Sequence, residues 1–211
     1  MGELSEAEIV NIIEYLDVED AADTLGLIAV HTMARVLEQA PPDVAADVLR
    51  AVDWEVARDI LSGMDDHDTV SQLLLYPDDD AGGLVTPEVV AFNQGISGAH
   101  AMQILRESDL PNKNFRHLFA VDREGHPVGR LSMSDLVLSP SGYTIQAIMN
   151  PDVFSVETGT DQEEVAHIIA RYQLRSLPVV DRDGVLVGAV AIGDIIQVAE
   201  DEATEDGRYG R

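Results

Sequence analysis

The first third of the chain spaces its apolar residues as an amphipathic helix does. Ala, Leu, Val and Ile recur three and four positions apart through residues 1–76, which predicts an all-α domain. Ser5 and Glu8 have the spacing of a capping box and mark the start of its first helix. The pattern Ala-Ala-Asp-x-Leu occurs at residues 21–25 and again at 45–49. Val70 and Leu73 continue the spacing, which gives a period of 24 residues in three units. This fixed period favours stacked helices, although three units also suit an ordinary small bundle.

The remaining two thirds contain a tandem repeat. Residues 85–90 align with residues 149–154, and the sequence Val-Asp-Arg-Glu-Gly at 121–125 aligns with Val-Asp-Arg-Asp-Gly at 180–184. Each copy predicts the order β-α-β-β-α, with a tight turn ending in glycine between its last two strands. The expected elements of the first copy are strands Val89–Phe92, Leu118–Val121 and Pro127–Ser132, a helix Ala99–Arg106 and a helix from near Asp135. Those of the second copy are strands Val153–Val156, Leu177–Val180 and Leu186–Ala191, a helix Gln162–Tyr172 capped by Thr160 with Glu163, and a helix from near Asp194.

A proline, an acidic run and two glycines separate these two parts, at residues 76–83. Such a segment cannot continue a helix, so the domain boundary is expected here. The acidic run lacks the spacing and the closing Glu of an EF-hand, which favours a solvated linker whose carboxylates stay available to a metal ion. The expected organisation is a helical domain at 1–76, a linker at 77–84, two similar domains at 85–140 and 141–200, and a tail at 201–211.

The composition narrows the class of protein. With 13 Lys+Arg against 39 Asp+Glu, the formal net charge is −26. Nucleic acids and anionic lipids both require a basic surface, so neither is expected as a partner. The chain has no cysteine, which excludes disulfides, zinc–thiolate sites and cysteine nucleophiles. Hydrophobic residues make up 45% of the chain, as in a globular protein.

The sequence argues against an enzyme. It contains no Walker loop, no GxGxxG, no HExxH and no GxSxG motif, and its six histidines lack metal-ligand spacing. The most apolar helical stretch, residues 25–37, is too short for a membrane span, and the start of the chain is acidic, unlike a signal peptide. A soluble, cytoplasmic protein is therefore expected.

The repeated part resembles the cystathionine-β-synthase (CBS) domain. The matching signature is Leu-Pro-Val-Val-Asp at residues 177–181, followed by Gly184, Gly188 and Asp194. The resemblance implies an α+β fold: an N-terminal all-α helical-repeat domain followed by a tandem CBS-domain pair, or Bateman module. In most families such pairs are regulatory, and they bind adenine nucleotides or metal ions.

The whole chain resembles the cytosolic region of the MgtE family of magnesium channels and transporters. The matches are the helical domain, the segment 80–88 after it, residues 160–166, and Glu-Ala-Thr-Glu-Asp at 202–206. The resemblance implies a homodimer formed through the CBS domains on the cytosolic face of the cell membrane, joined to a membrane pore domain that this chain lacks. It also implies that Mg²⁺ bridges acidic surfaces and favours a compact, closed state.

The resemblance implies a set of carboxylate ligands for Mg²⁺. They are Asp47, Asp68, Asp161, Glu163, Asp194, Glu202, Glu205 and Asp206. Gln173, Gln197 and Gly193 stand where the family has acidic residues, which predicts fewer or weaker ions. Each carboxylate also has a plainer interpretation as a helix-capping or solvated residue.

Adenine nucleotide is the alternative ligand. Nucleotide-binding CBS domains place a hydroxyl three residues before an aspartate, as Ser132 and Asp135 do in the first copy. The second copy has Ala191 in place of the hydroxyl, and Leu174 stands where some MgtE members stack the base on an aromatic residue. The alternative function is a stand-alone CBS-pair sensor of ATP or AMP that regulates a separate partner. A third hypothesis is a structural adaptor whose CBS pair binds nothing.

Overall fold

The computed structural model describes residues 5–108, 118–140, 142–193 and 195–196. The chain divides into two compact units, Met1–Pro77 and Asp78–Arg211, here called the helical unit and the repeat unit. Each unit has its own hydrophobic core, so each is described separately.

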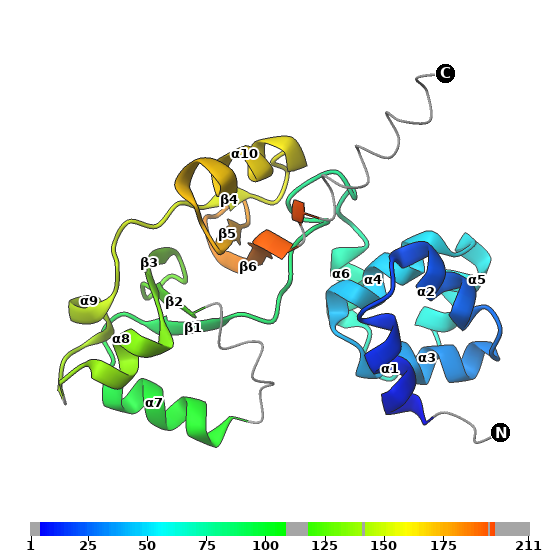
Figure 1. The fold of residues 1–211 in the computed structure, drawn as a ribbon, viewed down its shortest axis with the longest axis horizontal. Helices are drawn as coiled ribbons and strands as arrows, with labels where there is room; N and C mark the ends of the chain where they lie inside the picture. Colours follow the sequence, from blue (N-terminus) through cyan, green and yellow to red (C-terminus); the bar gives the residue numbers. More distant parts are fainter. Residues whose placement is uncertain (1–4, 109–117, 141, 194, 197–211) are drawn as a thin grey trace. The chain divides into compact units, whose positions relative to one another are not determined.

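The helical unit stacks its helices in two rows (Figure 1). One row is α1, α3 and α5, and the other is α2, α4 and α6, with each helix packed on the next in its row. The three leucines spaced 24 residues apart, Leu25, Leu49 and Leu73, are all buried in the second row. The predicted stacking is thereby confirmed, with two helices in each period. The helices are α1 Glu6–Ile13, α2 Val18–Leu25, α3 Val30–Gln39, α4 Pro42–Ala51, α5 Trp54–Leu61 and α6 Asp68–Leu73.

The described part of the repeat unit contains two three-stranded sheets of the same topology. In each sheet the first strand runs parallel to the second, and the second forms an antiparallel hairpin with the third. The first repeat contains β1 Val90–Asn93, α7 Gly98–Glu107, β2 Leu118–Val121, β3 Pro127–Leu131 and α8 Met133–Leu138. A short helix α9, Ile145–Ile148, leads to the second repeat, which contains β4 Val156–Glu157, α10 Gln162–Tyr172, β5 Ser176–Val180 and β6 Leu186–Ala191.

Each sheet buries one face against helices of its own repeat. In the first repeat, Phe92 of β1 and Leu118 of β2 pack in one core with Leu105 of α7 and Leu136 of α8. In the second repeat, Ile169 of α10 is buried along with the apolar residues of β5 and β6, and α10 packs against β5 (Figure 1). The β-α-β-β-α order predicted for the first copy is therefore present.

The two repeats exchange short segments at their sheet edges. Thr86, which precedes β1, pairs with Ala189 of β6, and Asn150, which precedes β4, pairs with Arg130 of β3. Each segment therefore adds to the sheet of the other repeat. Gly129 and Gly188 lie at these crossings, and a Cβ at either position would press on the crossing backbone. This contact explains why both copies of the repeat carry glycine there.

Both hairpin turns have the expected chemistry. Gly125 and Gly184 adopt φ angles of +93° and +81°, a region that costs glycine nothing because it has no Cβ. The capping box of Ser5 and Glu8 at the start of α1 is also present.

Several local predictions are wrong. The strand expected at Val153–Val156 is only Val156–Glu157. Asp161, rather than Thr160, caps α10, because its side chain accepts the backbone N–H of Glu163 at 2.8 Å. The helix expected from near Asp135 is present as α8, which begins at Met133.

The acidic segment that was expected as a solvated linker belongs to the repeat unit from Asp78 onward, and it is not fully solvated. The backbone N–H of Ala81 donates to Thr160 at 2.7 Å, and the N–H of Gln162 donates to Asp79 at 2.8 Å. Residues 81–83 are buried, so this segment is fixed to the start of α10 within the repeat unit.

Candidate functional site

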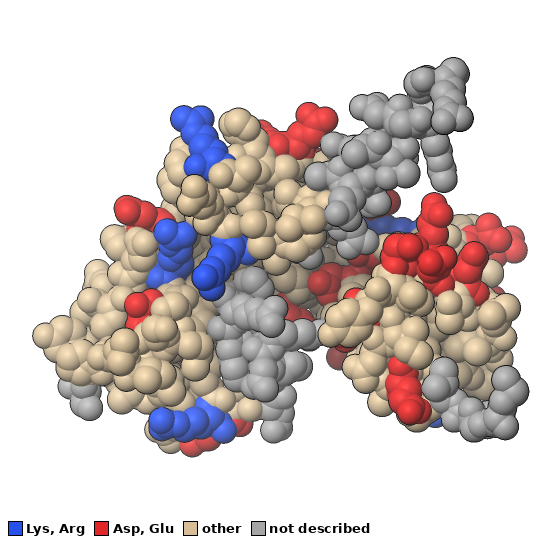
Figure 2. Space-filling view, viewed as in Figure 1, with Lys and Arg blue, Asp and Glu red and all other residues tan. Residues whose placement is uncertain are grey.

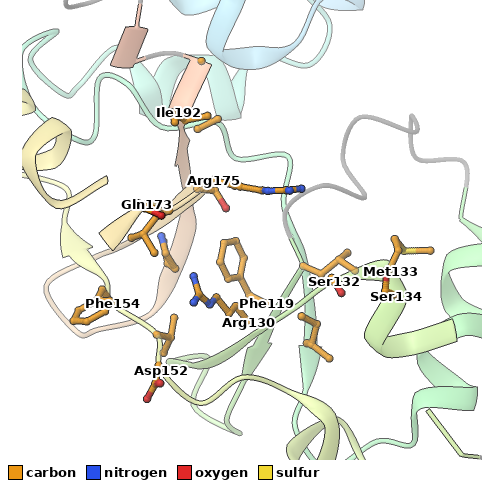
Figure 3. Close-up of a pocket in the computed structure, with 18 residues that line it drawn as sticks. Phe119, Arg130, Ser132, Met133, Ser134, Asp152, Phe154, Gln173, Arg175 and Ile192 are labelled. Atoms are coloured by element: carbon orange, nitrogen blue, oxygen red, sulfur yellow. The ribbon is translucent and has the colours of Figure 1, made fainter. Parts of the chain in front are cut away.

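A cleft of about 1190 Å³ lies between the two repeats of the repeat unit (Figure 3). Its walls come from the open ends of the two hairpins, where β2 and β5 begin and β3 and β6 end. Phe119 and Arg130 line it from the first repeat, and Arg175 and Ile192 from the second. The cleft therefore exists only because the repeats face each other.

Two arginines give this cleft a positive side in a strongly acidic protein. Arg130 is half-buried on β3, and Arg175 is exposed immediately before β5. Neither guanidinium has a carboxylate partner among the described residues. Asp152 is the acidic residue of the described lining. Because guanidinium groups recognise phosphate through paired N–H donors, the cleft suits an anionic ligand.

Aromatic surface lies at the same site. Phe154 lines the cleft and stacks on Tyr172, with ring centroids 4.2 Å apart. Leu174 also lines the cleft, and it is only 4% exposed. The family resemblance predicts the base-stacking position here, but leucine has no aromatic ring. The half-exposed ring of Phe154 therefore offers an aromatic face to the cleft, at a position that the sequence did not indicate.

The predicted hydroxyl and carboxylate of the first repeat lie together at the edge of the cleft. Ser132 lines it, and its Oγ donates to Oδ2 of Asp135 at 2.7 Å. The backbone N–H of Ser132 donates to the same oxygen at 2.7 Å, and the N–H of Asp135 donates back to the Ser132 hydroxyl at 3.2 Å. The pair thus forms the capping box of α8, so its carboxylate is already engaged by its own helix. Asp135 itself is not among the lining residues.

Sequence reasoning did not single out Arg130, Arg175 or Phe154. The available signal was position: each arginine lies beside a strand end in a chain with few basic residues. Phe154 carried no such signal, because its place in the cleft depends on how the second repeat meets the first.

Two predicted Mg²⁺ ligands lie in the helical unit. Asp47 of α4 accepts a hydrogen bond from Arg50 at 2.8 Å, and its side chain is 44% exposed. Asp68 is exposed in the first turn of α6. Residues 1–77 hold 17 carboxylates against three arginines, and Figure 2 shows acidic side chains gathered on the visible face of this unit.

Two further predicted ligands lie at the start of α10 in the repeat unit. Asp161 and Glu163 are both exposed, and Asp161 forms a backbone bridge with Asp80 of the acidic segment. The described residues nevertheless contain no group of three Asp, Glu or His side chains arranged around a metal position. Asp194, Glu202, Glu205 and Asp206 lie outside the described residues.

Comparisons with known proteins agree with this architecture. The CBS domain model matches residues 81–141 and 145–201, and the MgtE intracellular N domain model matches residues 4–86. A crystal structure of the cytosolic domain of the Mg²⁺ channel MgtE in complex with ATP is 34% identical, with a TM-score of 0.83 over 92% of this chain and 81% of that one. The soluble part of a magnesium transporter is 30% identical, with a TM-score of 0.78 over 95% of this chain and 84% of that one.

Sequence relatives point to the same family. The magnesium transporter MgtE of Thermus thermophilus is 42% identical over 65% of this chain and 30% of its own length. That of Bacillus subtilis is 30% identical over 97% of this chain and 48% of its own length. The chain thus spans less than half of these relatives.

The fold and its matches define a CBS-pair protein with a helical N-terminal domain. The chain belongs to the MgtE family of magnesium transporters and corresponds to the cytosolic, regulatory region of its members. This family is not enzymatic. Among the described residues, no helix has the length and apolar character that a membrane crossing requires.

Proposed function

We propose that this chain senses Mg²⁺ for an MgtE-type transporter and favours a compact, closed state when the ion is bound. The observation that carries the proposal is the pairing of an acidic helical unit with a CBS pair, the architecture shared with the cytosolic domain of the Mg²⁺ channel MgtE. The transported ion and the pore domain belong to the proposal as well, because the chain spans only part of its relatives.

The exposed carboxylates suit this ion. Mg²⁺ takes six oxygen ligands and keeps several waters, so it binds at loose carboxylate-lined surfaces without a closed protein cage. The described residues that would hold it are Asp161 and Glu163 at the start of α10, and Asp47 and Asp68 in the helical unit. Without the ion, surfaces of like charge repel one another, so ion binding and compaction are linked.

A homodimer formed through the CBS domains is part of the same proposal. Helices α7 and α8 pack on each other and expose Ile104, Val137 and Leu138, the last by 81%. A second copy would bury this apolar surface. Leu138→Glu is therefore expected to shift the protein towards monomer in light scattering coupled to size-exclusion chromatography. Leu75→Glu, at an equally exposed leucine of the helical unit, is the control that leaves the mass unchanged.

The Mg²⁺ proposal is tested by small-angle scattering of the 211-residue protein. After chelation, Mg²⁺ is titrated at constant ionic strength maintained with KCl, which separates specific binding from screening. We expect the radius of gyration to fall and then saturate. Asp161→Asn is expected to weaken the response, whereas Glu164→Gln, an exposed neighbour on α10 that the family pattern does not implicate, leaves it intact. A radius of gyration that does not change with Mg²⁺, or that changes by the same amount when KCl alone is added, contradicts the proposal.

We further propose that the cleft binds an adenine nucleotide. The cleft combines an aromatic face, the Ser132 hydroxyl and two arginines that have no carboxylate partner within the described part of the chain. The MgtE cytosolic domain with a TM-score of 0.83 was crystallised in complex with ATP. Calorimetric titration with ATP, AMP and GTP tests the proposal. If none of the three nucleotides binds, the proposal is contradicted.

A further inference from the structure

The two hairpin turns of the repeat unit meet each other. The turn of the first repeat, residues 122–126, lies against the turn of the second, residues 181–185. The backbone N–H of Leu186 donates to the carbonyl of Gly125 at 3.1 Å. His126 crosses the same contact, with its Nε2 3.1 Å from the carbonyl oxygen of Asp183. A Cβ on Gly184 would lie 3.2 Å from Cδ2 of the imidazole, so glycine leaves room for the ring.

The other ring nitrogen of His126 faces its own turn. Nδ1 lies 3.0 Å from Oδ2 of Asp122, whose Oδ1 accepts the backbone N–H groups of Glu124 and His126. The histidine side chain is 41% exposed and the aspartate 24% exposed. His126 therefore stands between a carboxylate of the first repeat and a carbonyl of the second.

Both of these acceptors lack a proton to donate. A carbonyl oxygen only accepts, and so does an ionised carboxylate. For both contacts to be hydrogen bonds, Nδ1 and Nε2 must each carry a hydrogen, which describes the imidazolium cation. A neutral imidazole has one N–H, so it satisfies only one of the two acceptors.

We propose that His126 is a proton-controlled link between the two CBS domains, in which the imidazolium joins the Asp122 carboxylate of the first to the Asp183 carbonyl of the second. Loss of the proton removes one of the two hydrogen bonds and the charge attraction to Asp122. The charged carboxylate of Asp122 is the stronger acceptor and keeps the remaining N–H on Nδ1. The contact between the turns therefore loses the bond to Asp183 and is left with the Leu186–Gly125 hydrogen bond.

The charges around His126 favour the cation. Its own turn supplies Asp122, Arg123 and Glu124, and the facing turn supplies Asp181, Arg182 and Asp183. The carboxylate of Asp181 is occupied by the backbone N–H groups of Asp183 and Val185. The hydrogen bond with Asp122 raises the pKa of His126; burial opposes this, and the charges of Asp122 and Glu124 and the Asp183 carbonyl add to it.

The link belongs to the first repeat alone. The position equivalent to His126 in the second repeat is Val185, although the turns are otherwise alike. Valine is therefore compatible with this turn and can replace the histidine as a folded, proton-insensitive variant. The turns lie at one end of the hairpins and the cleft at the other, roughly 10 Å along the strands. Protonation of His126 therefore changes how firmly the two walls of the cleft are held together.

Electron paramagnetic resonance distances test the proposal directly. Because the chain has no cysteine, Arg123→Cys and Arg182→Cys introduce one labelling pair, with one exposed site in each turn. We expect a narrow distance distribution at pH 5.5 that broadens at pH 8.5. In the same labelled background His126→Val should give a broad distribution at both pH values. His167→Gln, at an exposed histidine of α10, should behave as the parent does.

Nuclear magnetic resonance of the protein without spin labels supplies a second readout. The His126 ring should titrate above the ordinary value of about 6.5, and Asp122→Asn should move its midpoint down towards that value. Asparagine keeps an oxygen for the backbone N–H groups, so this variant retains the turn. A distance distribution that does not change with pH, or a His126 midpoint that Asp122→Asn leaves in place, overturns the proposal.

Discussion

Thr86 and Ala189 exchange a pair of backbone hydrogen bonds, N–H to carbonyl at 2.9 Å and 3.0 Å, although 103 residues separate them. The pair joins the entry of the first repeat to β6 of the second. Gly188 lies beneath this crossing, where a Cβ would overlap the Thr86 carbonyl and crowd Val85. The absence of a side chain at Gly188 is what lets the two repeats share an edge.

Gly188→Ala is expected to destabilise the repeat unit by about 1–3 kcal/mol, the usual cost of forcing an extra methyl into a packed contact. The obstacle is backbone, which cannot rotate away as a side chain can. Urea unfolding followed by circular dichroism measures the effect. Gly159→Ala is the matched control, because nothing lies within 4 Å of the added Cβ.

Gly129→Ala is expected to cost less than Gly188→Ala, although the two positions are equivalent in the repeat. The nearest atoms to its added Cβ belong to the flexible side chain of Met149, and the Asn150 carbonyl lies 3.1 Å away. Methionine adapts to such changes because it has several rotatable bonds. The same unfolding measurement ranks the variants, and equal losses would contradict this interpretation.

Arg50 is expected to stabilise the helical unit. Its side chain is 13% exposed, and it donates to Asp47 at 2.8 Å and to the carbonyl of Leu73 at 2.7 Å, which joins α4 to the end of α6. Arg50→Met keeps much of the apolar stem and removes these donors, so a loss of about 1–3 kcal/mol is expected. Arg58→Met is the control, because its side chain is 57% exposed and pairs with its neighbour Asp59. Thermal unfolding of the two variants should separate them.

The cleft arginines are expected to control nucleotide affinity. If Arg130 and Arg175 hold phosphate, replacing either by glutamine removes a charge-assisted hydrogen bond and should weaken ATP binding about 10- to 100-fold. Arg106→Gln, an exposed arginine of α7 away from the cleft lining, should leave the affinity unchanged. Calorimetric titration gives the three values. Affinities that stay the same in all three variants would place the nucleotide elsewhere.

The capping box of α1 predicts that the stability of this helix depends on pH only in the acidic range. The backbone N–H and hydroxyl of Ser5 both donate to Glu8 at 2.8 Å and lower the pKa of that carboxyl, while burial opposes them weakly. A lowered pKa means that the folded helix favours the ionised form. This stabilisation is complete above the ordinary value of 4.5 and disappears as the pH falls through the lowered value. The protection factors of the α1 amides, which correct hydrogen exchange for its intrinsic pH dependence, should therefore fall in that range in the parent, and Ser5→Ala should flatten the change.

The sequence was most informative where structure depends on neighbours along the chain. The helical spacing of residues 1–76, the 24-residue period and the glycine-ended turns each predicted an element or a packing order that the fold contains. The same information was insufficient at element ends. Whether Thr160 or Asp161 caps α10 depends on the residue at which the helix begins, and the distant acidic segment is hydrogen-bonded to the backbone of Thr160 and Gln162 at that point.

The sequence by itself determined the family, the two kinds of domain and the acidic surface, because these follow from motifs, periodicity and composition. Only the tertiary structure decided which distant residues meet. The exchange of edge segments, the arginine-lined cleft with Phe154, and the placing of His126 against Asp183 all join residues far apart in the sequence. Local pattern carries no record of such contacts, because they arise only when the two repeats fold against each other.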